Sequence, residues 1–286
     1  MAVTERDRER WAALARFGAE TARNVGDGII EQNTEIVTRK VGRANFATAA
    51  DHAAEEAILK ALAARTPDVP VLAEERADDT LRKAERLWVV DPIDGTLNFS
   101  RGIPFYCVAI GYVEGGAVRA AAVHAPRTGE TFCASWDRGS TRNGLALRVS
   151  TVAKTTEAYV VASLGFKEAA RPGSRFAQLN AASVRLRVLG SAVLELCYVA
   201  MGRFDLMVHS ALSPWDIAPP TVIAREAGAR IVSLRTGEDA AWDESQVIVG
   251  NPALVKDALA TLNLKAKPKS ALASALGLRL GGEKRT

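Results

Sequence analysis

The stretch Trp88-Val-Val-Asp-Pro-Ile-Asp-Gly-Thr-Leu-Asn98 is the most informative part of this sequence. An apolar strand leads into Asp91 and Asp94, with a proline between them to stiffen the chain and Gly95 after them to permit a tight bend. Both carboxylates can therefore face one point. The Gly95-Thr96 step is typical of a helix start, where free N–H groups receive a phosphate. The stretch predicts a cation and an anion held side by side, although Asp-Pro and Asp-Gly are also ordinary turn pairs.

Further acidic residues follow predicted strand or helix boundaries. Glu74 and Glu75 follow an apolar run, and Asp216 follows a Pro-Trp pair where a helix is expected. Taken alone, the glutamate pair suits a solvated loop and Asp216 suits a helix cap. If Glu74, Asp216 and the two aspartates of the first stretch converge, their charges repel unless cations lie between them. Because this set offers oxygen ligands without a Cys or His cluster, it favours Mg²⁺ over Zn²⁺.

The composition is that of an ordinary globular protein, with 286 residues, 48% of them hydrophobic and 24% charged. These values exclude wholesale disorder and collagen-like structure. No apolar run approaches the roughly 20 residues of a membrane-spanning helix, and the charged start Met1–Arg10 does not suit a secretory signal. Cys107, Cys133 and Cys197 form no CxxC pair. We therefore expect a cytoplasmic protein with reduced cysteines.

The net charge of +4 is modest for this length, and much of the basic excess lies from Lys265 onward. A solvated terminus accounts for such a tail better than contact with an anionic partner. We therefore predict a flexible tail over residues 266–286, with no nucleic-acid partner and no membrane association.

Two periodicities predict the secondary structure: helical spacing of apolar residues, and short apolar runs bounded by Gly, Pro and Asp. The expected helices span residues 7–30, 51–66, 175–182, 191–201, 216–227 and 252–262. The expected strands span residues 69–72, 87–90, 105–113, 117–124, 130–134, 158–162, 185–188, 204–208, 230–233 and 246–249. A Gly-Gly link predicts an antiparallel meander in the half over 1–150, and alternation of strands and helices predicts layered α/β packing over 151–265.

Several motifs in order give the chain a resemblance to a known family. They are Thr48-Ala-Ala-Asp51, Glu74-Glu75, Asp91-Pro-Ile-Asp-Gly-Thr96 with Asn98-Phe99, Gly190-Ser-Ala192, and Trp215-Asp216 leading to Glu226-Ala-Gly228. From about Lys40 to Leu262 the sequence resembles the inositol monophosphatase family of Mg²⁺-dependent, lithium-sensitive phosphomonoesterases. The resemblance implies an α/β fold, a layered αβαβα sandwich of the inositol monophosphatase/fructose-1,6-bisphosphatase type. Lys40 matches a basic residue near the active-site mouth in the family.

The resemblance also implies roles for individual residues. Two or three Mg²⁺ ions would be held by Glu74, Asp91, Asp94, Asp216 and the backbone carbonyl of Ile93. The catalytic set would be Glu74 and Thr96, which orient the attacking water, and Asp51, which helps to hold a third metal through water. The substrate would contact Asp94, Gly95, Thr96, Gly190, Ser191, Ala192, His209 and Asp216. Phosphoryl transfer by activated water requires no covalent enzyme nucleophile.

The sequence departs from the family pattern in three places. Ala73 replaces a usual glycine, and Pro219-Pro220 stands after Trp-Asp, where a first helical turn would tolerate prolines but the pocket wall would change shape. His209, seven residues before Asp216, replaces a glutamate that accepts hydrogen bonds from substrate hydroxyls in inositol-cleaving members. A neutral imidazole offers one donor and one acceptor, and it gains charge near a pH of about 6.5. A histidine packed at a strand end would fit the local sequence too, so inositol preference is left open.

These features together predict a phosphoric monoester hydrolase acting on a small polyol or sugar-like phosphomonoester, with inositol-1-phosphate as the default substrate. Histidinol phosphate, 3′-phosphoadenosine 5′-phosphate and fructose-1,6-bisphosphate are the alternative substrates. A regulatory binding protein on the same fold is the alternative of a different class. From the resemblance we also expect a homodimer.

Overall fold

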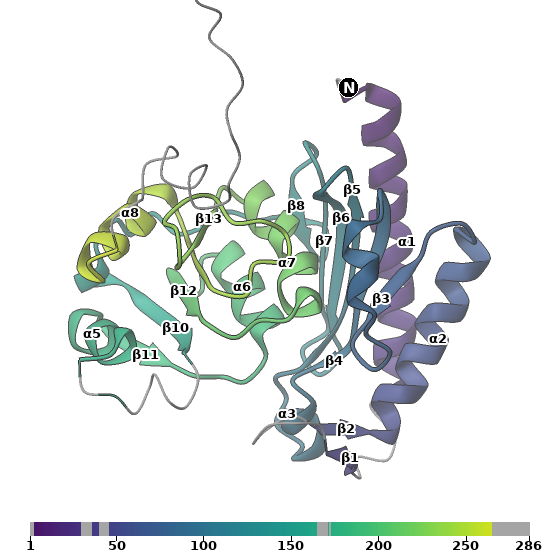
Figure 1. The fold of residues 1–286 in the computed structure, drawn as a ribbon, viewed down its shortest axis with the longest axis horizontal. Helices are drawn as coiled ribbons and strands as arrows, with labels where there is room; N and C mark the ends of the chain where they lie inside the picture. Colours follow the sequence, from purple (N-terminus) through teal and green to yellow (C-terminus); the bar gives the residue numbers. More distant parts are fainter. Residues whose placement is uncertain (1–2, 30–35, 40–45, 165–170, 172, 265–286) are drawn as a thin grey trace, which may run out of the picture.

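The described parts of the chain form five layers, in which helices and sheets alternate (Figure 1). The computed structural model describes residues 3–29, 36–39, 46–164, 171 and 173–264. Lys40 and the predicted tail over 266–286 therefore lie outside the described residues. Within the described ranges, no helix has both the length and the apolar composition needed to cross a membrane.

The predicted helices and strands occur in the predicted order with shifted ends, and the short strands over residues 36–39, 46–48, 140–142 and 145–146 were not predicted. The helices are α1 (Glu5–Ile29), α2 (Ala49–Arg65), α3 (Thr96–Ser100), α5 (Arg175–Ala182), α6 (Ala192–Ala200), α7 (Pro214–Glu226) and α8 (Pro252–Thr261), with 3₁₀ helices η1 (Asp79–Lys83) and η2 (Thr155–Glu157). The first strands are β1 (Ile36–Arg39), β2 (Phe46–Thr48), β3 (Val71–Ala73), β4 (Arg86–Asp94), β5 (Cys107–Glu114), β6 (Ala117–Ala125), β7 (Glu130–Ser135), β8 (Ser140–Arg142) and β9 (Leu145–Ala146). The others are β10 (Tyr159–Ser163), β11 (Arg185–Arg187), β12 (Leu206–His209), β13 (Arg230–Ser233) and β14 (Val247–Gly250).

The larger sheet has the order β3-β4-β5-β6-β7-β8-β9 among the described strands. The predicted meander is confirmed from β4 to β9, where every pairing is antiparallel, whereas β3 runs parallel to β4. Side chains of β4 alternate between its faces, as a strand requires. Trp88 and Val90 pack into the core beneath α1 and α2, while Leu87 and Val89 pack into the central core that contains α6 and α7.

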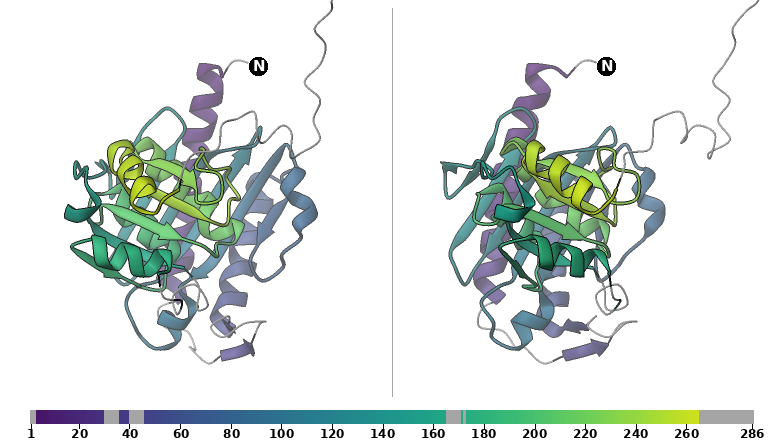
Figure 2. Two further views of the ribbon diagram at one scale, coloured as in Figure 1. Left: turned by 60° about the vertical axis from the view of Figure 1, so that its left-hand side comes forward. Right: turned by 90° about the vertical axis from the view of Figure 1, so that its left-hand side faces the viewer.

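The smaller sheet has the order β11-β10-β12-β14-β13 among the described strands. Its inner face packs on α6 and α7, and its outer face is covered by α5 and α8. Figure 2 shows α5 and α8 on the opposite side of the molecule from α1. The layered αβαβα fold is therefore confirmed.

The starts of two helices differ from the prediction in a way that matters for the site. α2 begins at Ala49 with Thr48 as its N-cap, and α7 begins at Pro214 with Ser213 as its N-cap. Asp51 and Asp216 are therefore third residues of their helices rather than first ones. Each accepts the backbone N–H of the N-cap residue, at 2.7 Å and 2.6 Å respectively. Such a bond satisfies a donor that has no partner within the helix.

The prediction that Pro219 and Pro220 lie in the first turn of their helix was wrong, because the helix begins earlier than expected. Because α7 begins at Pro214, Pro219 and Pro220 lie in its second turn, where each removes a helical hydrogen bond. Pro219 is buried against β5 rather than in a pocket wall. A Cβ added to Gly111 of β5 would lie 3.1 Å from Pro219 Cα and 3.2 Å from its N. The missing side chain at position 111 thus allows α7 to approach the sheet closely.

Substitution Gly111→Ala should lower the free energy of unfolding by about 1–3 kcal/mol, because the new methyl group would overlap the Pro219 backbone. The control is Gly18→Ala in α1, where an added Cβ would make an ordinary contact of 3.6 Å with Ala122 Cβ. That control should stabilise the protein by about 0.5–1 kcal/mol, because alanine is the better helix former. Denaturant unfolding measures both values, and equal effects would contradict the close approach.

Candidate active site

A β-bulge in β4 turns its two aspartates toward the same face of the sheet. Asp91 pairs with Ala109 and Asp94 with Cys107, so three steps along β4 match two along β5. In a regular strand, residues three apart point to opposite faces. The extra residue corrects this: the Ile93 side chain packs under α1 and α2, while Asp91 and Asp94 line a cavity on the other face. The predicted strand end at residue 90 was wrong, since β4 continues to Asp94.

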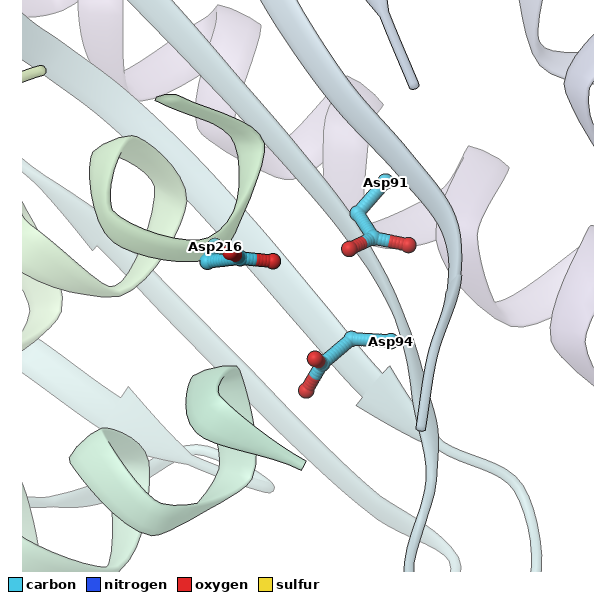
Figure 3. Close-up of side chains that lie close together, drawn as sticks. All are labelled: Asp91, Asp94 and Asp216. Carbon is cyan, nitrogen blue, oxygen red and sulfur yellow. The ribbon is translucent and has the colours of Figure 1, made fainter. Parts of the chain in front are cut away.

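Carboxylates from separate elements converge on this cavity, which has a volume of about 240 Å³. One carboxylate oxygen from each of Asp91, Asp94 and Asp216 lies within 4.8 Å of the other two (Figure 3). Glu74, which follows β3, lines the same cavity. Ile93, Gly95, Thr96 and Gly190 also border it. The structure therefore brings together all the residues that the sequence suggested as metal ligands.

The electrostatics of this cluster are unfavourable without a cation. Burial raises the pKa of Asp91 well above its ordinary value, and the negative charges of Glu74, Asp94, Asp216 and Asp51 raise it further. Asp91 is 1% exposed, and its Oδ1 has no hydrogen-bond partner among the described residues. A buried oxygen without a donor, surrounded by like charges, is stabilised by a metal ion. The donor set contains only oxygen atoms, so the residues present fit Mg²⁺.

Asp94 connects the cavity to the start of α6. Its Oδ2 accepts the backbone N–H of Val193 at 2.9 Å and a short hydrogen bond from the Ser191 hydroxyl. Burial raises the pKa of Asp94 to about 6, and these hydrogen bonds oppose that rise. Ser191, which was expected to bind substrate, is 1% exposed, and its hydroxyl donates a hydrogen bond to Asp94.

Asp51 lies behind the cavity and holds Thr96. Its Oδ2 accepts from Thr48, and its Oδ1 lies 3.0 Å from the Thr96 hydroxyl, which is also 3.0 Å from the Ile93 carbonyl oxygen. The Asp51 side chain is fully buried. Burial raises the pKa of Asp51, while the hydrogen bonds from Thr48 and Thr96 act in the opposite direction. The geometry gives Asp51 a direct role in orienting Thr96.

A second cavity, of about 330 Å³, joins the first, because Glu74, Asp94, Gly190 and Asp216 line both. His209, at the end of β12, lines this second cavity together with Ala192, Ser163 and Trp215. Burial lowers the pKa of His209 to about 4. The lowered pKa favours the neutral imidazole at pH 7 over the charged form that the sequence alone allows.

Two residues of this region escaped the sequence reasoning. Asn98 was quoted within a motif but was given no role, and it hydrogen-bonds across to Leu189. Glu195 is 1% exposed within α6 and accepts backbone N–H groups at the edge of the cavity. A single acidic residue in the apolar segment Ala192–Ala200 is a signal that could have been noticed.

A class of metal-dependent phosphatases shares this layered fold and an acidic cleft that offers only oxygen ligands. The model of the inositol monophosphatase family matches residues 8–267, so the chain belongs to that family. A relative from Thermotoga maritima named fructose-1,6-bisphosphatase/inositol-1-monophosphatase is 34% identical over 80% of this chain and 88% of its own. A Vibrio cholerae relative named Nus factor SuhB is 32% identical over 85% and 93%. A solved Thermotoga maritima IMPase superposes with a TM-score of 0.79 at 31% identity, covering 88% of this chain and 97% of its own.

Mg²⁺ should stabilise the wild-type protein, while Asp91→Asn should reduce that effect strongly. At a Mg²⁺ concentration 100 times its Kd, binding to the folded chain adds about 2.7 kcal/mol to the free energy of unfolding. Thermal unfolding with Mg²⁺ and with a chelator measures the difference. An equal Mg²⁺ effect in the two proteins would contradict the assignment of Asp91 as a ligand.

In chelator, Asp91→Asn should be more stable than the wild type at pH 7, because the substitution removes a buried carboxylate whose charged form is disfavoured. The folded-state pKa of Asp91 is raised, so the folded chain binds this proton more tightly than the unfolded chain. The metal-free wild type should therefore gain stability as pH falls through the raised pKa of Asp91 toward the ordinary aspartate value, and Asp91→Asn should gain less. Parallel pH profiles for the two proteins would contradict this.

Proposed function

We propose that this protein hydrolyses a small polyol or sugar-like phosphomonoester with the aid of Mg²⁺. The observation that carries the proposal is the convergence of three carboxylates beside the backbone of Gly95 and Thr96, one of which has a buried oxygen without a hydrogen-bond partner among the described residues. A cavity of this kind suits a phosphate group that arrives together with its neutralising cations. Phosphoryl transfer requires mainly such positioning and charge compensation.

The metal ligands in this proposal are Glu74, Asp91, Asp94, Asp216 and the Ile93 carbonyl oxygen. When bound there, Mg²⁺ supplies positive charge that neutralises phosphoryl oxygens and lowers the pKa of water.

The chain's own groups would position the reactants. Thr96, fixed by Asp51, and Glu74 would orient the attacking water, and the backbone N–H groups of Gly95 and Thr96 would donate to phosphate oxygens. α3 has only five residues and Gly95 as its N-cap, with a φ of 94°. Its dipole is therefore small, and the N–H groups themselves would provide the phosphate contacts.

The second cavity would receive the alcohol part of the substrate, bordered by Gly190, Ala192 and His209. Its lining offers hydrogen-bonding groups suited to hydroxyls, so inositol-1-phosphate is the default substrate. The Thermotoga maritima relative's name includes both inositol-1-phosphate and fructose-1,6-bisphosphate chemistry. Trp215 also lines this cavity, which keeps 3′-phosphoadenosine 5′-phosphate among the alternatives with histidinol phosphate.

The purified protein should release phosphate from inositol-1-phosphate with a kcat/KM at least equal to those for the three alternative substrates. Phosphate release with Mg²⁺ is the measurement, and Asp91→Asn is the inactive control. A kcat/KM about tenfold higher for another substrate would correspond to about 1.4 kcal/mol of transition-state preference and would replace the default.

His209 should affect the alcohol side of the reaction. His209→Glu supplies two acceptor oxygens in place of one donor and one acceptor, so the preference for inositol-1-phosphate over an ester without hydroxyl groups should rise about threefold to tenfold. The ratio of the two kcat/KM values measures this effect. An unchanged ratio would remove His209 from the substrate-binding set.

The non-enzyme alternative is supported by the relative named Nus factor SuhB. A regulatory binding role would survive Asp91→Asn, whereas hydrolysis would not, so the same variant separates the two functions.

We also propose that residues 1–150 supply most of the metal ligands, that residues 151–265 complete the substrate pocket, and that the protein is a homodimer. Light scattering of the purified protein tests the homodimer.

A further inference from the structure

The Leu189-Gly190 segment lies between β11 and α6, at the junction of the two cavities. Gly190 lines both of them. In the proposed function, phosphate contacts come from the backbone of Gly95 and Thr96, and alcohol contacts come from Gly190 and the start of α6. The relative placement of these two backbone segments would therefore set the alignment of the scissile bond.

Asn98 connects the two segments directly. Its Nδ2 donates to the Leu189 carbonyl oxygen and to the Phe105 carbonyl oxygen, each at 2.8 Å. A side-chain amide has two N–H donors, and both are used here. Asn98 belongs to α3, two residues after Thr96, and it is 8% exposed. The side chain thus joins the proposed phosphate-binding turn to the proposed alcohol-binding segment.

Glu195 holds the same segment from the side of α6. Its Oε1 accepts the N–H of Leu189 at 2.9 Å and the N–H of Gly190 at 3.3 Å. Leu189 is therefore fixed at its carbonyl by Asn98 and at its N–H by Glu195. The Oε2 of Glu195 is buried and makes no hydrogen bond in the described part of the chain.

The junction leaves little space for a side chain at Gly190 or at Gly95. Gly190 has a φ of +83°, and a Cβ added to it would lie 3.3 Å from Asn98 Nδ2. A Cβ added to Gly95 would lie 3.3 Å from the Gly190 carbonyl oxygen. Both distances are tighter than an ordinary van der Waals contact. The two backbone segments therefore lie close together, so a shift in one would displace the other.

We propose that Asn98 and Glu195 are positioning residues that fix the Leu189-Gly190 segment against the phosphate-binding turn, and so align the alcohol part of the substrate with its phosphate. This inference rests on the proposed function. Asn98 lines the first cavity and Glu195 lines the second, and the Asn98 Nδ2 and the Glu195 Oε1 are taken up by the backbone groups named above, so the proposal assigns neither side chain to phosphate or metal. Their loss should therefore act on the alcohol side of catalysis more than on the phosphate side.

The kinetic test compares Asn98→Ala and Glu195→Leu with the wild type on two esters. Both variants should lose about tenfold to hundredfold in kcat/KM for inositol-1-phosphate, because small misplacements of a reacting group are costly. For p-nitrophenyl phosphate, whose aryl group makes no hydroxyl contacts and leaves easily, the loss should be below about threefold. Glu195→Gln retains an acceptor oxygen for both N–H groups and should restore most of the activity lost in Glu195→Leu.

An activity-independent measurement accompanies the kinetics. Hydrogen exchange of the metal-free proteins should be faster at the Leu189 and Gly190 amides in Glu195→Leu and Asn98→Ala, with Glu195→Gln close to the wild type. Equal losses on the two esters, or unchanged exchange at these amides, would overturn the inference. If the wild type releases no phosphate from either ester, the proposed function fails, and hydrogen exchange alone decides whether the two residues fix the segment. Should Asn98→Ala not fold, the two Glu195 variants make the same comparison.

Discussion

The extra residue in β4 is the constraint on which the site depends. It reverses the alternation of the strand once, so that Asp94 faces the same layer as Asp91 while Ile93 remains in the opposite core. A regular strand would bury one carboxylate in the apolar core beneath α1 and α2, which is costly for a charged group. With the bulge, both carboxylates reach the layer between the sheets, where α6 and α7 begin. α6 and α7 fill that layer, with one sheet packed on each side.

N–H groups at helix starts offset part of the negative charge of the acidic side chains that lie close together here. Asp51 and Asp216 each accept an N-cap N–H of their own helix, and Asp94 accepts N–H groups at the start of α6. Free N–H groups at helix starts stabilise negative charge, so these carboxylates are partly compensated by the backbone. Asp91 lies on a strand without such compensation, and burial together with the neighbouring negative charges raises its pKa well above the ordinary aspartate value. A cation beside Asp91 would therefore stabilise its buried carboxylate.

The sequence predicted features that depend on local pattern. Periodicity located the longer helices and strands, and the Asp-Pro-Ile-Asp-Gly-Thr motif located the acidic centre. Other features depend on contacts between distant segments. The bulge at Asp91 to Asp94 is set by pairing with β5, and the positions of Asp51 and Asp216 within their helices depend on N-cap residues just outside the predicted ends. Strands as short as β8 and β9 have no detectable period. The pairing of Asn98 with Leu189 spans 91 residues and leaves no local signal.

The hydrogen bond from Val193 to Asp94 closes a chain segment of 99 residues. During synthesis on a ribosome, β4 emerges long before α6, so the acidic strand exists for a time without the backbone groups that later surround it. Closing so long a loop is slow compared with forming the β4 to β7 meander, whose contacts are local. The acidic cluster is therefore completed late in folding, when α6 and α7 pack against the larger sheet. A chain that still lacks α6 and α7 has neither Asp216 nor the N–H group of Val193 beside Asp94, so its acidic cluster is incomplete.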